Sequence, residues 1–134
     1  MTPPRSAVVL FAHGSRDPLW HVPIEAVARQ ARQMAPDMPV LCAYLELTSP
    51  DLPEAIAALK DHNIRHIRIL PMFLGVGRHA REDLPLLLQG LRQTHPELEL
   101  ELLPAVGEHP AMTTLMAELA TGRSLSIKAH DDQV

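Results

Sequence analysis

The sequence predicts an α/β fold in which a four-stranded parallel sheet carries helices on both faces. Three observations predict it. The chain contains four short apolar runs of the kind found in buried strands. Each run is followed by a segment in which apolar residues recur at helical spacing, and turn or helix-start residues separate the two kinds of segment. Regular alternation of this kind indicates right-handed crossovers and therefore parallel strands.

The four strands are assigned to the apolar runs at residues 8–12, 39–45, 64–73 and 98–103. The first run, VVLFA, is continuously apolar, as expected of a strand that is covered on both faces. The third run leads into the loop LGVGRH, which contains two glycines.

The four helices are predicted from their apolar stripes and their start and stop residues. The first begins at Pro23, which is tolerated in a first helical turn, and the second begins near Asp51. Leucines mark the third helix at 84–91. The fourth occupies 110–120, and Gly122 is placed to end it in a left-handed conformation.

Length and composition limit the domain organisation. The chain has 134 residues, of which 46% are hydrophobic, and this is enough for one compact domain. We therefore expect a single domain over residues 1–122. Residues 123–134 show no apolar periodicity and are expected to be disordered.

Charge and the N-terminal segment argue against several classes of partner. Lys and Arg total 12 against 16 Asp and Glu, the net charge is −4, and only 3% of residues are aromatic. These values do not fit a nucleic-acid-binding protein. The apolar run 7–12 is too short for a signal sequence or a membrane span. The single cysteine, Cys42, is interpreted as a small buried residue. We expect a cytoplasmic protein that binds neither nucleic acid nor membrane.

Polar side chains follow the carboxyl ends of all four predicted strands. His13 follows the first strand, Glu46 closes the second, His79 follows the third through its glycine-containing loop, and Glu108 and His109 follow the fourth. Because parallel strands end at one edge, where ligands bind, these side chains are expected to share that edge. Two imidazoles and a carboxylate suit a divalent transition metal such as cobalt, nickel, iron or zinc. The sequence therefore predicts a metal site at this edge.

Each of these residues also has a structural explanation. His13 could hydrogen-bond loop carbonyls, and Glu46 could be a solvated strand end. His109 precedes a proline and is more simply explained as the start of a helix. Asp17 also precedes a proline and is interpreted as a turn or helix-start residue. The remaining histidines are interpreted as solvated surface residues: His21, His62, His66, His95 and His130.

Three other activities are poorly supported. Ser15 lacks the G-x-S-x-G elbow and has no clear acid partner, which argues against hydrolysis. The loop glycines have no third glycine after them, so the loop does not match a nicotinamide-binding fingerprint. A histidine-dependent phosphatase would need Arg-His-Gly at the first strand, whereas Ala12 precedes His13.

Two stretches, FAHGSRDP and LPMFLGVGRHAREDLP, resemble the signature pair of the short CbiX-type sirohydrochlorin chelatases, which are relatives of the SirB ferrochelatases. YLELTSPDLPEAI and LPAVGEHP resemble that family's second and fourth strand-end segments. The resemblance extends from about residue 8 to residue 119. It implies a chelatase-like, flavodoxin-like domain that inserts a divalent metal into sirohydrochlorin, a tetrapyrrole on the routes to cobalamin and sirohaem.

By position, the resemblance implies roles for individual residues. His13 and His79 match the family's two metal-site histidines, and His13 also matches its proton acceptor. The macrocycle site would be lined by Glu46 and by the loop Leu74, Gly75, Val76, Gly77 and Arg78. The family varies at Val76 and Arg78, so the contacts that hold the ring stay open. Cobalt is the expected metal, iron and nickel are alternatives, and no further cofactor is expected.

The chemistry of metal insertion fits these residue types. The reaction strips water from the ion and removes two pyrrole protons. Neutral imidazoles can replace the water ligands, and a histidine can accept a proton near neutral pH. Glu46 could take the second proton or orient a histidine. The alternative function is a carrier that binds metal or tetrapyrrole without catalysis.

Two further expectations concern charge and assembly. Because the substrate carries many carboxylates, Arg16, Arg78 and Arg81 are expected to form an electropositive rim. Larger chelatases of this type resemble two such units fused in one chain, and a single unit offers only half of a cleft for a tetrapyrrole. We therefore expect a homodimer with twofold symmetry whose metal-binding edges face each other.

Overall fold

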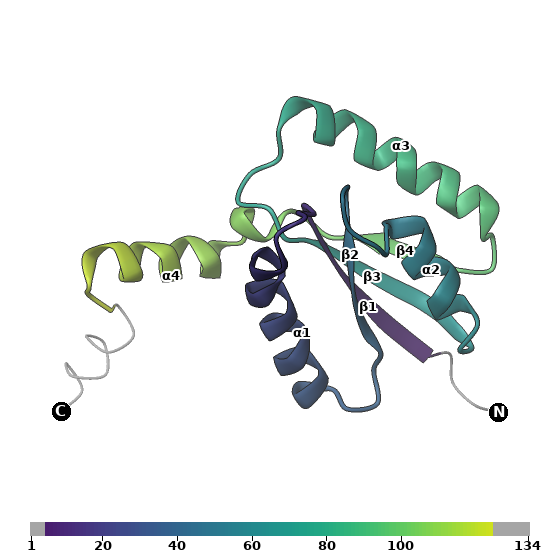
Figure 1. Cartoon of the computed structure of the whole chain (residues 1–134), viewed down its shortest axis with the longest axis horizontal. Helices are drawn as coiled ribbons and strands as arrows, with labels where there is room; N and C mark the ends of the chain where they lie inside the picture. The colour runs from purple at the N-terminus through teal and green to yellow at the C-terminus, as the bar shows by residue number, and fades with distance from the viewer. Residues whose placement is uncertain (1–4, 125–134) are drawn as a thin grey trace.

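The computed structural model describes residues 5–124, which contain one sheet of four parallel strands (Figure 1). The strands are β1 (Arg5–Ala12), β2 (Val40–Tyr44), β3 (Ile64–Pro71) and β4 (Glu99–Leu102). Their order is β2-β1-β3-β4, and all three pairings are parallel. The predicted parallel α/β sheet is confirmed. Its winding direction changes between β1 and β3, as in a doubly wound sheet.

The helices follow the strands in the predicted alternation. They are α1 (Val22–Met34), α2 (Leu52–Lys60), α3 (Arg78–Thr94) and α4 (Pro110–Thr121), and two short 3-10 turns, η1 (Pro18–His21) and η2 (Val106–Glu108), precede α1 and α4. On one face α1 packs over β2 and β1, while α2 and α3 cover the other face. The structure departs from the prediction at α4, which has no buried residue and extends away from the sheet (Figure 1).

The larger core lies between the sheet and the helices α2 and α3. Successive residues of a strand point to opposite faces, so Ala7, Val9 and Phe11 of β1 enter this core together. A smaller cluster under α1 contains Leu10 and Val40. This division explains why VVLFA is apolar throughout, since both faces of β1 are covered. Each fully buried Leu, Ile or Phe stabilises the fold by about 1.5–3 kcal/mol.

Local hydrogen bonds determine where the helices begin and end. The Asp51 carboxylate accepts from the Glu54 N–H at 2.9 Å, and Glu54 Oε1 accepts from the Asp51 N–H at 3.1 Å, so α2 begins with a capping box. Asp17 Oδ1 accepts from the Leu19 N–H at 3.0 Å, which confirms the helix-start interpretation of Asp17. Gly122 follows α4 with φ 69°, which confirms the predicted left-handed cap.

Several element boundaries differ from the prediction. The first strand begins at Arg5 instead of residue 8, and α3 begins at Arg78, inside the predicted loop 74–79. Helical structure begins at Pro18 instead of Pro23, because Asp17 caps the 3-10 turn that leads into α1. The third strand ends at Pro71 instead of residue 73, and Phe73 turns toward His13. Within residues 5–124, no helix is both long and apolar enough to cross a bilayer. Most of the predicted disordered tail, residues 125–134, lies outside the described residues.

Candidate functional site

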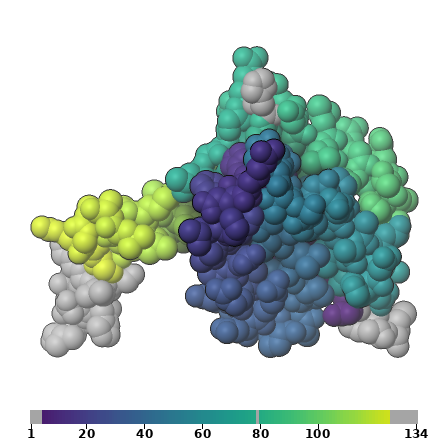
Figure 2. Space-filling view, in the orientation of Figure 1, coloured from purple at the N-terminus to yellow at the C-terminus, as the bar shows by residue number. Residues whose placement is uncertain are grey.

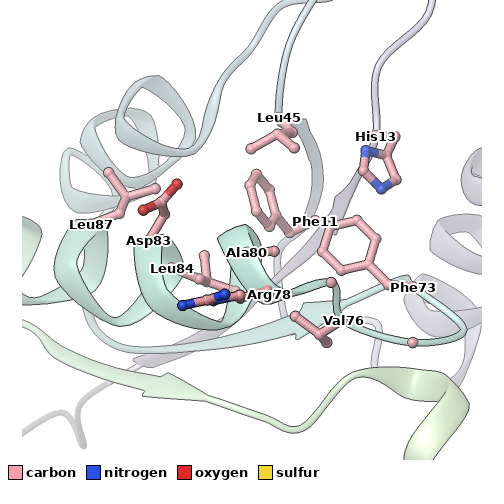
Figure 3. Close-up of a pocket in the computed structure, with 12 residues that line it drawn as sticks. Phe11, His13, Leu45, Phe73, Val76, Arg78, Ala80, Asp83, Leu84 and Leu87 are labelled. Carbon is pink, nitrogen blue, oxygen red and sulfur yellow. The ribbon is translucent and has the colours of Figure 1, made fainter.

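A pocket of about 500 Å³ opens at the carboxyl edge of the sheet, where the neighbouring strands β1 and β3 end (Figure 3). The winding of the sheet changes between these two strands, and this is the position at which open parallel sheets bind ligands. Phe11 and His13 line the pocket from the β1 side, Leu45 lines it from the end of β2, and Leu84 and Leu87 line it from α3. The walls are therefore mainly apolar, with a few polar groups at the mouth.

His13 lies at the mouth of this pocket with its side chain exposed. The centroid of its ring lies 4.6 Å from that of Phe73, with a tilt of 45°, and Phe73 in turn contacts Phe11 edge-on at 6.0 Å (Figure 3). The Trp20 Nε1–H donates to the His13 carbonyl oxygen at 3.1 Å. Phe73, backed by Phe11, therefore supports one side of the His13 imidazole, and the Trp20 indole holds the His13 backbone through a hydrogen bond.

Gly14 brings Glu46 close to His13. A Cβ at position 14 would lie 1.6 Å from the Glu46 carbonyl oxygen, so this approach of two loops requires glycine. The Leu45 N–H also donates to the Ala12 carbonyl at 2.8 Å. Glu46 thus lies at the predicted edge beside His13. Its side chain is exposed and does not line the pocket, so its role stays a prediction.

The loop after β3 forms another wall of the pocket. Residues 75–78 line it together with His13, whereas Leu74 is 71% exposed and does not. Their contact with a macrocycle stays a prediction. Gly107 allows the chain after β4 to support this loop. Its N–H donates to the Phe73 carbonyl at 3.0 Å, and a Cβ there would lie 1.9 Å from the Leu74 carbonyl oxygen.

His79 is the second residue of α3 and directly follows Arg78 of the pocket wall. Its side chain lies outside the part of the chain that is described, so the meeting of the two imidazoles stays a prediction. Among the side chains that are described, no group of three or more His, Cys, Asp or Glu is placed to hold a metal ion.

Positive and negative side chains both lie around the pocket, whereas the predicted rim was positive. Arg78 Nε lies 3.3 Å from Glu82 Oε1, and both side chains are largely exposed. Asp83 adds a carboxylate to the pocket wall. Arg16 and Arg81 are exposed and do not line the pocket. An excess of positive charge at this mouth therefore depends on Arg16 and Arg81, and it stays a prediction.

Glu108 and His109 share the edge with His13 but lie in a different hollow, a groove beside the end of β4. His109 Nδ1 accepts from the Ala111 N–H at 3.1 Å and caps α4. This confirms the structural explanation of His109 as a helix start. Neither residue lines the His13 pocket.

Three histidines that were expected to be solvated, His21, His66 and His95, have partners in the structure, and for these that expectation was wrong. His95 Nδ1 lies 3.5 Å from Lys60 Nζ. His21 Nε2 lies 3.2 Å from Thr48 Oγ1. His66 Nε2 lies 2.9 Å from Glu101 Oε1, and its Nδ1 lies 3.2 Å from Ser6 Oγ. These partners come from neighbouring strands and loops that are 27 to 60 positions away in sequence, so no local pattern signalled them.

Sequence reasoning missed the aromatic surroundings of His13. Phe11 and Phe73 had been assigned only to strands, and Trp20 had no role. The chain has only two Phe and one Trp, and all three contact or adjoin His13 in the structure. Asp83 was also missed as a residue of the pocket wall. The one available sequence signal for these surroundings was that aromatic residues are scarce in the chain.

Comparison with known proteins covers nearly the whole of this fold. The CbiX family model matches residues 7–122, a segment that includes the His13 pocket. The chain belongs to the CbiX family. Within that family, the described fold is similar to the crystal structure of a putative cobalamin (vitamin B12) biosynthesis CbiX protein from Marinobacter aquaeolei. The TM-score is 0.76 and the identity 26%, over 87% of this chain and 95% of that one.

Two curated relatives of this CbiX-family chain are named sirohydrochlorin cobaltochelatase. The protein from Methanothermobacter thermautotrophicus is 36% identical over 85 residues, which are 63% of this chain and 59% of that protein. The protein from Methanococcoides burtonii is 26% identical over 121 residues, which are 84% of this chain and 92% of that protein. The match thus spans about three fifths of the first relative and most of the second.

Proposed function

We propose that this chain is a sirohydrochlorin chelatase that inserts a divalent metal, cobalt first, into sirohydrochlorin for cobalamin or sirohaem synthesis in the cytoplasm. One observation carries the proposal. An exposed imidazole, His13, lies at the mouth of an apolar pocket at the switch point of a CbiX-family sheet. The names of the two cobaltochelatase relatives support the substrate and the choice of metal.

His13 has two tasks in this proposal. As a neutral imidazole it offers a nitrogen lone pair that replaces one water of the incoming ion, and after transfer it accepts a pyrrole proton. Within the described residues no hydrogen bond occupies either ring nitrogen, and the packing on Phe73 leaves them available for both tasks. His79 provides the second metal ligand.

Insertion releases two pyrrole protons for each divalent ion, so a second acceptor is needed. Glu46 takes this role in the proposal, because its backbone lies against Gly14, the residue after His13. The metal ion is a substrate of the reaction, and no resident cofactor is part of the proposal.

The shape of the pocket suits one face of a flat, apolar ring. Phe73 and Val76 offer apolar surface, and Arg78 at the mouth is placed to pair with a peripheral carboxylate. A volume of about 500 Å³ lies within the usual range of about 300–1,000 Å³ for pockets that bind drug-sized molecules, whereas a tetrapyrrole is a larger ligand. The remaining surface comes from a second copy of the chain, which makes the homodimer part of the proposal.

The proposal is tested by mixing protein, sirohydrochlorin and Co²⁺ under anaerobic conditions and measuring the insertion rate from the absorption change of the macrocycle. Wild type is expected to exceed the spontaneous rate, and His13→Ala and His79→Ala are each expected to lose about 100-fold or more. His62→Ala serves as the matched control, because His62 is exposed and does not line the pocket. Its rate is expected to equal that of wild type.

The same mixture separates catalysis from the alternative, a non-catalytic carrier of metal or tetrapyrrole. A carrier would bind sirohydrochlorin or Co²⁺ without raising the insertion rate above the spontaneous one. Binding without acceleration would therefore refute the chelatase proposal and favour the carrier.

A further inference from the structure

One side-chain hydroxyl joins the segment that contains His13 to the segment that contains Glu46. The first segment, residues 13–21, follows β1 and is dark purple in Figure 2, where it lies at the surface against the blue segment 45–50 that follows β2. Thr48 Oγ1 donates to the Ser15 carbonyl oxygen at 2.8 Å and accepts from the Ser15 N–H at 3.3 Å. The hydroxyl thus binds both backbone polar groups of a residue that is two positions from His13.

A third hydrogen bond at this hydroxyl comes from His21. His21 Nε2 lies 3.2 Å from Thr48 Oγ1. A hydroxyl has one proton and two lone pairs, and the proton of this one is directed at the Ser15 carbonyl, so His21 Nε2 is the donor of the third bond. The His21 ring also packs on Tyr44, with centroids 4.7 Å apart, and Tyr44 is only 4% exposed. The hydroxyl therefore has all three of its hydrogen bonds, and a buried residue of β2 supports the donor of the third.

The backbone between Glu46 and Thr48 adopts a conformation that needs support. Leu47 has φ 67°, in the left-handed region that residues with a Cβ rarely occupy. Such a conformation persists only where neighbouring contacts determine it. The contact of the Glu46 carbonyl with Gly14 lies on one side of Leu47, and the hydrogen bonds of Thr48 lie on the other. The shape of this segment is thus coupled to its contact with the segment after β1.

Thr48 provides the side-chain link between the two segments. The Ser15 Oγ accepts from the Asp17 N–H at 3.0 Å, which is a bond within the segment after β1. The Leu45 N–H donates to Ala12, which is a backbone bond at the strand ends. Within residues 5–124, every side-chain hydrogen bond between segments 13–21 and 45–50 involves Thr48.

We propose that Thr48 is a positioning residue for metal insertion, a role that rests on the proposed function. Its hydroxyl fixes the segment that presents the His13 imidazole on the segment that presents the Glu46 carboxylate. These two groups are the two proton acceptors of the proposed reaction, and His13 is also a metal ligand in it. Thr48 itself contacts neither the metal nor the macrocycle, and it acts by holding the two acceptors at a fixed separation.

A fixed separation matters because both acceptors must reach protons of the same bound ring. Proton transfer needs a heavy-atom distance of about 2.6–3.2 Å, and a displacement of about 1 Å can cost a factor of about 100 in rate. The Glu46 side chain is exposed and does not line the pocket, so its place depends on the backbone of its segment. Loss of the Thr48 hydroxyl should therefore affect kcat more than the binding of the macrocycle, which depends on the pocket walls.

The first test compares Thr48→Val with Thr48→Ser in steady-state metal insertion. Valine keeps the shape of threonine without the hydroxyl, so kcat is expected to fall about 10-fold to 100-fold while the KM for sirohydrochlorin changes less than threefold. Serine keeps the hydroxyl and is expected to retain about a third or more of the wild-type kcat. Thr94→Val is the matched control, with an unchanged kcat, because the Thr94 hydroxyl also donates to a backbone carbonyl, that of Gly90 at 3.0 Å, and does not line the pocket.

Three results of this comparison would overturn the proposal. The first is a Thr48→Val chain with the wild-type kcat. The second is a loss that Thr48→Ser shares in full, because the hydroxyl would then not be the group that matters. The third is an equal loss in Thr94→Val. Thr48→Ala gives the same readout if the valine variant does not fold.

The second test is amide hydrogen exchange of the ¹⁵N-labelled full chain, followed by NMR. The Ser15 N–H donates to the Thr48 hydroxyl, so this amide is expected to exchange about tenfold faster in Thr48→Val. The Met72 amide is the internal control, because it donates to the Phe11 carbonyl at 2.7 Å and is expected to exchange at the wild-type rate. Equal exchange at Ser15 in the two chains would overturn the proposal, since the hydroxyl would then not join the segments.

The exchange measurement does not depend on metal insertion. A wild-type chain that inserts no metal, in which Thr48→Val still speeds exchange at Ser15, would refute the proposed function and leave the link between the segments standing. A Thr48→Val chain that inserts metal at the wild-type rate would refute the positioning role alone.

Discussion

At the level of single residues, the His13 imidazole is restrained through contacts that leave its nitrogens unused. Phe73 supports the ring, and Trp20 binds the backbone oxygen. An aromatic contact of this kind is worth about 0.5–1.5 kcal/mol beyond the area that it buries. The ring is thus oriented before any metal or macrocycle arrives, which is what a ligand that must bind and then release an ion requires.

Arg78 provides a test of substrate binding at the pocket mouth. Arg78→Ala is expected to raise the KM for sirohydrochlorin about threefold to tenfold and to change kcat less, because a peripheral carboxylate is held equally before and during insertion. Glu82→Gln should act in the opposite direction, since it releases Arg78 from its ion pair. Steady-state kinetics of both variants give the answer. Unchanged KM values in both would remove Arg78 from the binding site.

Cys42 provides a test that is independent of function. Burial raises the pKa of the Cys42 thiol, and the nearby Arg32 opposes this only in part. The thiolate fraction at pH 8 is therefore lower than in an ordinary cysteine, and a disulfide reagent is expected to react with Cys42 more slowly than with free cysteine at that pH. The rate of thiol modification as a function of pH measures this. Reaction at pH 8 as fast as that of free cysteine would contradict it.

At the level of elements, the loops around the pocket approach one another where glycine removes a side chain. Gly14 admits the Glu46 carbonyl, and Gly107 admits the Leu74 carbonyl. The strands supply a rigid frame. The close approach at Gly14 brings the segment after β2 beside His13, and the one at Gly107 brings the segment after β4 against the loop that follows β3. The site thus depends on the backbone as much as on its side chains.

Alanine substitutions at two glycines measure this dependence. Gly14→Ala places a Cβ 1.6 Å from a carbonyl oxygen, so the loops must separate, and the free energy of unfolding should fall by about 1–3 kcal/mol. Gly90→Ala is the matched control. Gly90 lies inside α3 with nothing within 4 Å of the added Cβ, so this variant should gain about 0.5–1 kcal/mol. Urea unfolding gives both values, and a Gly14→Ala chain as stable as wild type would show that the approach is not tight.

At the level of the whole molecule, the described chain forms one half of the proposed dimeric chelatase. One pocket lies at one edge of one sheet, and the helix that would complete the layer above β3 and β4 points away from the body. In the proposed function, a second copy of the chain supplies the second wall of the cavity.

The dependence on a second copy has a kinetic signature. The insertion rate per chain is expected to rise with protein concentration and to level off above the dimer dissociation constant found by sedimentation. Rates measured over a dilution series test this. A rate per chain that stays constant into the range in which the protein sediments as a monomer would show that one chain suffices.

Much of this protein can be derived from short-range patterns in its chain. Strand and helix alternation, the helix starts at Asp17 and Asp51 and the Gly122 cap all depend on residues within about four positions of one another, and the structure confirms them. The shared edge of the strand-end residues follows as well, because it depends only on the strands being parallel. Nothing comparable signals contacts between distant segments. Phe73 meets His13, and Glu101 meets His66, only after register and loop path are set by packing.

The direction of α4 likewise depends on contacts between distant segments. Its helical spacing and its cap are local and were predictable, whereas its departure from the sheet depends on how Gly107 packs against the Leu74 loop. Local hydrogen bonds and side-chain periodicity are encoded along the chain. The direction of a helix relative to the sheet depends on contacts between segments that are distant along the chain, and so only the tertiary structure decided it.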